Sequence, residues 1–189
     1  MPRNATDEDA ALRARLVQIV ASSDWFCGLL AAGRSLGLAS WCIGAGALRN
    51  LVWDRLHGYA APSPLADVDF AYFDADDLSP ATEKSLQARL NQLCPGEPWE
   101  VTNQAAVHLC FERHFGHPVE PLSSLEAAVA TWPEYATSVA MTLSASGDIE
   151  VICPHGLHDL FAMIVRRNPT RVSMETFGQR VAQKNYAAR

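Results

Sequence analysis

The stretches IGAGALRN at residues 43–50 and ADVDFAYFD at residues 66–74 carry the strongest structural signals in this sequence. The first begins at the end of an apolar run over residues 39–43 and leads into leucine and valine residues at helical spacing. This pattern predicts a buried strand, a glycine turn and a helix over residues 47–56. The second stretch is rich in β-branched and aromatic residues, which predicts a strand over residues 68–73.

The glycine turn between the first strand and its helix has two interpretations. Gly44 and Gly46 let another group approach the backbone closely. The start of the helix offers free N–H groups and the positive end of the helix dipole, an arrangement that binds phosphate. A glycine pair at this point is also compatible with a tight connection and nothing more.

Asp67 and Asp69 are separated by one residue on the predicted strand, so their carboxylates project from the same face. The two carboxylates repel each other unless a cation lies between them. An all-oxygen pair suits Mg²⁺, which binds through one or two carboxylates together with substrate phosphates. The alternative is that Asp67 only begins the strand and Asp69 faces solvent. The apolar neighbours Val68, Phe70 and Tyr72 argue against this, because they indicate a buried strand.

Caps, prolines and periodicity predict the other elements. Helices are expected near residues 6–20, from 24 to Gly33 or Gly37, and near 80–93, 124–132, 156–166 and 173–187, with strands near 99–102, 139–143 and 149–153. Residues 105–115 fit either a helix or a strand. The sequence therefore predicts a single α+β domain, with N-terminal helices over residues 1–37, a sheet core over 38–153 and C-terminal helices over 154–189.

Length and composition favour a folded, soluble protein. The chain has 189 residues, of which 49% are hydrophobic and 19% charged, values that oppose disorder. No apolar run approaches the roughly 20 residues that span a bilayer, and the first residues are polar and acidic. We therefore expect a cytoplasmic protein with no membrane contact. The five cysteines form no C-x-x-C pair and are predicted to be buried free thiols.

Charge is distributed unevenly along the chain. The net charge of −6 opposes binding of a long nucleic acid over the whole surface. Residues 160–189 contain six basic residues and one acid, a net charge of +5, which leaves −11 on the other residues. A solvated helix face and a local phosphate site are the two interpretations of this basic segment.

These motifs resemble those of the nucleotidyltransferase superfamily, which has a polymerase β-like fold. The segments AGALRN at 45–50 and DVD at 67–69 are similar to the Gly-Gly-x-Val-Arg-Asp and Asp-x-Asp motifs of tRNA nucleotidyltransferases. From about residue 15 to residue 185, the chain resembles a bacterial family described as nucleotidyltransferase-like. The segments that carry this wider resemblance are WEVTNQ at 99–104, WPE at 132–134, GLHDLF at 156–161 and RNP at 167–169. The resemblance implies a mixed β-sheet flanked by helices.

The resemblance also implies a metal site. In the superfamily, two aspartates on one strand and a third carboxylate on a neighbouring strand hold two Mg²⁺ ions, and Mn²⁺ is a possible substitute. Asp67 and Asp69 match the pair. Glu100 is the candidate for the third carboxylate, because it lies on the next predicted strand after one helix. Asp74 and Asp148 are the alternatives.

The implied reaction transfers a nucleoside monophosphate from a nucleoside triphosphate, such as ATP, to an acceptor hydroxyl while pyrophosphate leaves. Gly44 and Gly46 would let the triphosphate approach the helix start. Arg49 would pair either with a phosphate or with an acid on its own or a neighbouring helix. Glu100 or Asp69 would take the hydroxyl proton. The acceptor would be a small molecule or a protein side chain.

Two departures from the tRNA enzymes oppose a CCA-adding activity. Asn50 stands where those enzymes have aspartate, and the loop between Arg49 and Asp67 is longer than theirs. The net negative charge of the protein also opposes the binding of tRNA. Two other interpretations keep the fold without turnover, namely an inactive nucleotide-sensing or protein-binding module, and an antitoxin-like partner in a two-component system. The sequence does not set the acceptor, the base preference or the oligomeric state.

Overall fold

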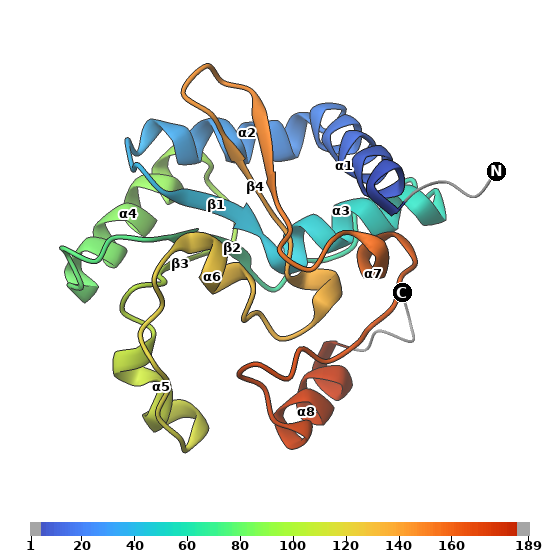
Figure 1. Ribbon diagram of the computed structural model, residues 1–189. Helices are drawn as coiled ribbons and strands as arrows, with labels where there is room; N and C mark the ends of the chain where they lie inside the picture. The colour runs from blue at the N-terminus through green and yellow to red at the C-terminus, as the bar shows by residue number, and fades with distance from the viewer. Residues whose placement is uncertain (1–4, 185–189) are drawn as a thin grey trace.

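The computed structural model describes residues 5–184, which form a five-stranded sheet with helices packed around it (Figure 1). The strands are β1 (Trp41–Gly44), β2 (Val68–Tyr72), β3 (Trp99–Asn103), β4 (Ala140–Leu143) and β5 (Ile149–Ile152). They lie in the order β3-β2-β1-β4-β5. β2 and β3 are parallel and the other neighbouring pairs are antiparallel. The predicted mixed sheet and the α+β class are confirmed.

Most of the helices begin where the sequence predicts. The helices are α1 (Ala5–Ala21), α2 (Asp24–Ser35), α3 (Ala45–His57), α4 (Pro80–Leu93), α5 (His108–Phe115), α6 (Leu125–Val129), α7 (His158–Phe161) and α8 (Met174–Lys184), with a 3-10 helix at Tyr135–Thr137. Ser23, Ser79 and Ser124 accept hydrogen bonds from backbone N–H groups in the first turns of α2, α4 and α6. These side chains therefore cap the three helices.

Three local predictions need correction or completion. The helix expected over residues 156–166 is only one turn, because Met163 adopts a positive φ of 54° and the Ile164 N–H donates to the Asp159 carbonyl oxygen at 2.9 Å. This is the bond that closes a helix at its C-terminus. The ambiguous segment 105–115 contains α5. The last predicted helix is α8, and its expected residues 185–187 lie outside the described part of the chain.

All five cysteines are free, but they are not all buried. Cys42 and Cys153 are buried, Cys27 and Cys94 are half-buried, and Cys110 is exposed. Cys110 lies on α5, which buries Phe111 and leaves the neighbouring Leu109 62% exposed. The prediction of buried thiols is therefore wrong for Cys110, because α5 packs through one narrow face.

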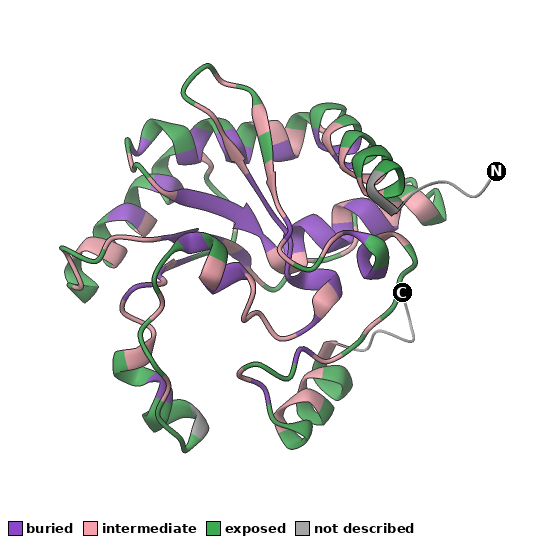
Figure 2. Ribbon diagram, in the orientation of Figure 1, coloured by how far each residue is buried: buried purple, intermediate pink, exposed green. Residues whose placement is uncertain are grey.

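The two faces of the sheet are covered very differently. One face carries Ile43, Phe70 and Val101 and packs against apolar residues of α1, α2, α3 and α4, which form the main core. The other face carries small residues, Cys42 and Ala71 among them, and is covered by α6. Figure 2 shows the buried residues gathered on the sheet and on α3. The part of the second face that α6 leaves uncovered is where polar side chains can lie without entering the core.

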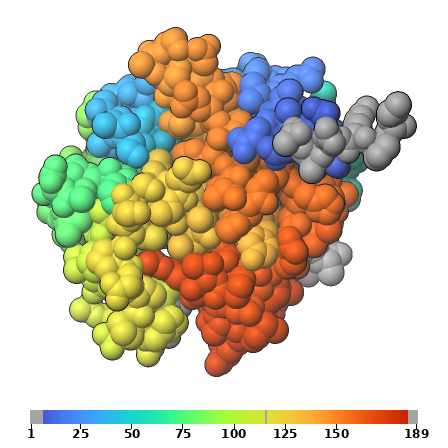
Figure 3. Space-filling view, viewed as in Figure 1, coloured from blue at the N-terminus to red at the C-terminus, as the bar shows by residue number. Residues whose placement is uncertain are grey.

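The C-terminal helix α8 lies outside this core. It contains no buried residue. In Figure 3 the C-terminal segment reaches across to the region of α5, with a hollow between the two. Within residues 5–184, no single helix is long and apolar enough to cross a membrane, and only the bent pair of α1 and α2 passes that test together, on length and composition alone.

We expect Gly44→Ala to destabilise the fold. A Cβ at residue 44 would lie 2.4 Å from the Val139 carbonyl oxygen and 2.7 Å from the Ala140 Cβ. β4 would have to move, at a cost of about 1–3 kcal/mol in the free energy of unfolding. Gly28→Ala is the matched control. Nothing lies within 4 Å of a Cβ at this position of α2, and alanine has a higher helix propensity than glycine, so this variant should not be destabilised. Urea unfolding that gives both variants the same stability would contradict this packing.

Candidate functional site

The three predicted carboxylates lie on one face of the sheet. Asp69 is on β2, and Asp67 directly precedes that strand. Glu100 is the register partner of Asp69 on the parallel strand β3. Side chains of register partners leave the sheet on the same side, and so do side chains two residues apart on one strand. Asp67, Asp69 and Glu100 all line one pocket of about 230 Å³.

The start of α3 forms one wall of this pocket. Ala45, Gly46 and Arg49 line it. A Cβ added to Gly46 would lie 3.7 Å from Asp67 Oδ1, an ordinary van der Waals contact, so this part of the backbone lies beside the carboxylate. Ala45 has a positive φ of 49°, a strained conformation for a residue with a side chain. This conformation lies at the junction where β1 ends and α3 begins.

The structure gives Gly44 and Arg49 surroundings that differ from the expectation. Gly44 was expected to admit the triphosphate, and Arg49 to pair with a phosphate or an acid. Gly44 does not line the pocket, and the absence of its side chain admits the backbone of β4. Arg49 is buried, with its Nη2 donating to Asn50 Oδ1 at 2.7 Å and its guanidinium over the Trp53 ring. The structure therefore brings Arg49 to the pocket wall, already held by its helix neighbours.

Two cations of α8 complete the pocket, and the sequence reasoning did not single them out. Lys184 Nζ lies 3.6 Å from Asp67 Oδ2. Arg180 Nε donates to Glu134 Oε1 at 2.9 Å, and Glu134 is only 1% exposed. Two sequence features could have identified them. Residues 160–189 carry a net positive charge, and the i, i+4 spacing of Arg180 and Lys184 places both side chains on one helix face. Which acids this face would meet was not visible in the sequence.

The electrostatics of the pocket show that the carboxylates are crowded. Burial, and then the charges of Asp67 and Glu100, raise the pKa of Asp69 to about 7, while Lys184 and Arg180 oppose this shift. An acid with this pKa is only partly ionised at neutral pH. The charges of Lys184 and Arg180 are therefore not enough to keep Asp69 fully ionised at neutral pH.

The residues fit a hard divalent cation. All three acidic side chains offer oxygen, the donor that Mg²⁺ and Mn²⁺ prefer, and they face a pocket open to a ligand. No group of three His, Cys, Asp or Glu side chains in residues 5–184 is close enough to form a ready-made metal cluster. The carboxylates therefore suit a cation that is shared with substrate phosphates better than a closed structural site.

The alternative third carboxylates lie elsewhere. Asp74 accepts hydrogen bonds from the backbone N–H groups of Asp76 and Asp77 in the turn after β2. Asp148 accepts from Ser146 in the hairpin turn between β4 and β5. Neither lines the carboxylate pocket. Of the three candidates, Glu100 is the one that the fold brings to Asp69.

Comparisons with known proteins agree with this architecture. A family model described as nucleotidyltransferase matches residues 31–189. The chain is also similar to a protein whose NMR structure is described as revealing a CCA-adding enzyme head domain. That match has a TM-score of 0.77 and 28% sequence identity, and it covers 92% of this chain and 90% of the other. No curated protein matches the sequence significantly.

The crowding of the carboxylates predicts that Asp69→Asn stabilises the metal-free protein at pH 8. The folded-state pKa of about 7 lies above the ordinary value of 3.8, so the folded protein holds this proton more tightly than the unfolded chain does. The free energy of unfolding of the wild type should therefore fall as the pH rises from 3.8 through 7. Asparagine removes this fall and should gain stability at pH 8, on the order of 4 kcal/mol for a shift from 3.8 to about 7.

Urea unfolding in the presence of a chelator, at pH 5 and pH 8, measures this effect. The exposed Asp76→Asn is the control, and its stability should stay within about 0.5 kcal/mol of the wild type. Equal stability of wild type and Asp69→Asn at pH 8 would show that burial and the neighbouring acids do not raise the pKa of Asp69.

Proposed function

The chain belongs to a nucleotidyltransferase family, and from this premise we propose that it transfers a nucleoside monophosphate to a hydroxyl of a small molecule or a protein, with Mg²⁺ bound at Asp67, Asp69 and Glu100. Family and fold establish a nucleotidyltransferase that uses a nucleoside triphosphate. The observation that carries the finer proposal is the register pairing of Asp69 with Glu100, beside Asp67, in an open pocket.

The chain's own residues divide into a metal side and a phosphate side. The three carboxylates would hold two Mg²⁺ ions, or Mn²⁺ in their place. Bound metal would acidify the acceptor hydroxyl and offset the charge of the leaving pyrophosphate. Gly46, at the start of the 13-residue helix α3, and Arg49 offer backbone N–H groups and a guanidinium to the triphosphate. Lys184 and Arg180 extend this positive wall from α8.

Glu100 is the best placed base. It is exposed, whereas Asp67 and Asp69 are half-buried, so an acceptor arriving from solvent meets Glu100 first. In the proposed step the acceptor oxygen bonds to the α-phosphorus, and the bond from that phosphorus to the pyrophosphate oxygen breaks. The hydroxyl proton passes to the Glu100 carboxylate. The products are a phosphodiester and pyrophosphate.

The acceptor is inferred from the size and charge of the pocket. A volume of about 230 Å³ admits the reacting groups and not a folded polynucleotide. The net charge of −6 opposes a long phosphate backbone over the rest of the surface. The in-register position of Glu100 also favours a working enzyme over a nucleotide-sensing module, since a sensor does not need a base at this point.

Nucleotide binding provides the first test. We expect ATP, GTP, CTP or UTP with Mg²⁺ to raise the thermal stability of the wild type. A ligand at 100 times its dissociation constant stabilises by about 2.7 kcal/mol. Asp69→Asn should start from a higher melting temperature and lose the further increase, whereas Asp76→Asn should keep it. An increase that persists in Asp69→Asn would place the nucleotide elsewhere, and no increase with any nucleotide would contradict the proposed function.

The third carboxylate is tested separately. Glu100→Gln should weaken Mn²⁺ binding in the presence of a non-reactive triphosphate analogue by about tenfold, equivalent to 1.4 kcal/mol, because one oxygen donor loses its charge. Asp74→Asn is the matched control and should leave Mn²⁺ affinity unchanged. Electron paramagnetic resonance of free Mn²⁺ gives both affinities. The opposite pattern, with loss in Asp74→Asn only, would reassign the third ligand.

A further inference from the structure

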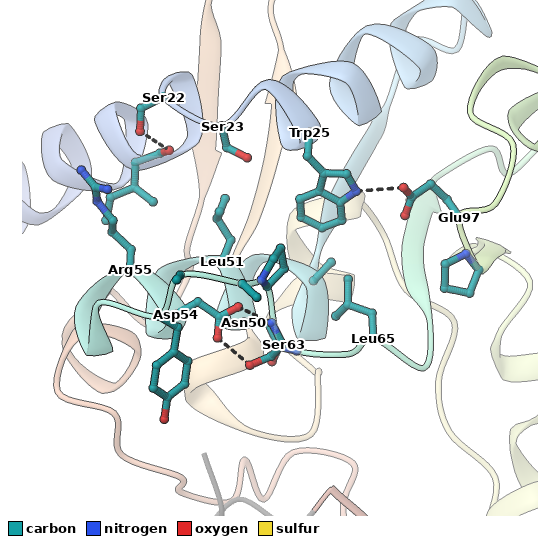
Figure 4. Close-up of a pocket in the computed structure, with 17 residues that line it drawn as sticks. Ser22, Ser23, Trp25, Asn50, Leu51, Asp54, Arg55, Ser63, Leu65 and Glu97 are labelled. Carbon is teal, nitrogen blue, oxygen red and sulfur yellow. Dashed lines mark hydrogen bonds between the residues drawn. The ribbon is translucent and has the colours of Figure 1, made fainter.

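A second and larger pocket lies on the adjacent face of α3. Its volume of about 630 Å³ is in the range of small-molecule sites. It lies between the junction of α1 and α2 on one side and the segment 59–65 on the other (Figure 4). Its walls include Trp25, Leu51 and Leu65, which gives it a largely apolar interior with an aromatic ring. Such a surface favours a flat, apolar ligand body.

The two ends of this pocket differ in charge. At one end the Trp25 indole N–H donates to Glu97 Oε1 at 2.9 Å, which fixes the ring. At the opposite end lies Arg55 (Figure 4). Arg55 is exposed and has no hydrogen bond or ion pair to any residue in the described range 5–184. A guanidinium without a protein partner at the rim of an apolar pocket favours an anionic group on the ligand.

The outer wall of the pocket is formed before any ligand arrives. Both carboxylate oxygens of Asp54 hold Ser63, one accepting from its backbone N–H at 2.7 Å and the other from its hydroxyl at 2.6 Å. These bonds tie the segment 59–65 to α3. A preformed wall lowers the entropy that a ligand loses on binding.

Asn50 connects this pocket to the carboxylate pocket. It lines the larger pocket, and its Nδ2 lies 3.4 Å from the Pro64 carbonyl oxygen, to which it donates. Its Oδ1 accepts from Arg49, which lines the carboxylate pocket. Asp67 follows the segment 59–65 by two residues. A ligand that contacts Asn50 therefore acts on Arg49, a residue of the proposed nucleotide site.

We propose that the pocket between α2, α3 and the segment 59–65 binds a small, flat, largely apolar anion as a second ligand, and that its occupancy changes nucleotide affinity through Asn50. The binding claim is independent of the proposed function. The coupling claim rests on it, since it requires a nucleotide at the carboxylate pocket. Coupling between two sites is reciprocal and is typically between 5-fold and 150-fold.

The binding claim is tested with 1-anilinonaphthalene-8-sulfonate, whose aromatic rings and sulfonate match the two ends of the pocket. Titration into the wild type should shift the Trp25 indole N–H resonance, which is assigned by its loss in Trp25→Phe. Arg55→Ala should weaken binding by about tenfold. Arg113→Ala, an exposed arginine on α5, is the control and should not. An unmoved Trp25 resonance, or equal loss in both arginine variants, would overturn the site.

The coupling claim is tested by measuring the affinity of a non-reactive triphosphate analogue with Mg²⁺, with and without saturating 1-anilinonaphthalene-8-sulfonate. We expect a change of at least about fivefold in the wild type. Asn50→Asp keeps an oxygen toward Arg49 and loses the donor toward Pro64, so it should abolish the change. An equal affinity with and without the probe in the wild type overturns the coupling. Absence of nucleotide binding without the probe contradicts the proposed function instead and leaves the binding claim standing.

Discussion

The placing of three carboxylates, Asp67, Asp69 and Glu100, together on one face of the sheet is the constraint on which the rest of the site depends. Parallel pairing of β2 with β3 sets Asp69 and Glu100 side by side, and the period of a strand adds Asp67 to the same face. Burial and like charge raise the pKa of Asp69 to about 7. A protein that keeps three acids in this arrangement loses stability, and a bound cation would restore it.

The surrounding helices position the three carboxylates and leave them accessible. The apolar face of the sheet is sealed by α1 to α4, so it fixes the strand positions without help from the other face. On that second face, α6 covers small residues and leaves the acids accessible. The start of α3 and the cationic side of α8 then approach from two directions. α8 buries no residue, and its ion pairs to Asp67 and Glu134 link it to this pocket.

The sequence predicted the elements well where they depend on interactions between residues close together in the chain. The starts of α2, α4 and α6 and the strands β2, β4 and β5 depend on neighbours in the chain, and each was predicted. The register of Asp69 with Glu100 was within reach because a strand, a helix and a strand connect in one hand. The early end of α7 was not predictable in this way. It depends on a positive φ at Met163, and the residue that adopts this conformation at the end of a helix is usually glycine.

Contacts between distant segments account for what the sequence could not supply about the site. Nothing near Gly44 indicates that its missing side chain admits β4, about 95 residues later. In the same way, the charge of residues 160–189 fitted either a solvated helix face or a phosphate site, and only the fold places Lys184 at Asp67. The buried Glu134 was likewise hidden, because an acid followed by tyrosine and alanine carries no burial signal.

The most direct measurement is a crystal structure with Mn²⁺ and a non-reactive triphosphate analogue, using the anomalous scattering of manganese to locate the metal. The account predicts manganese peaks bounded by Asp67, Asp69 and Glu100, with the triphosphate running toward the start of α3 and the cations of α8. Manganese at any other group of side chains, or a triphosphate bound away from these carboxylates, would contradict it.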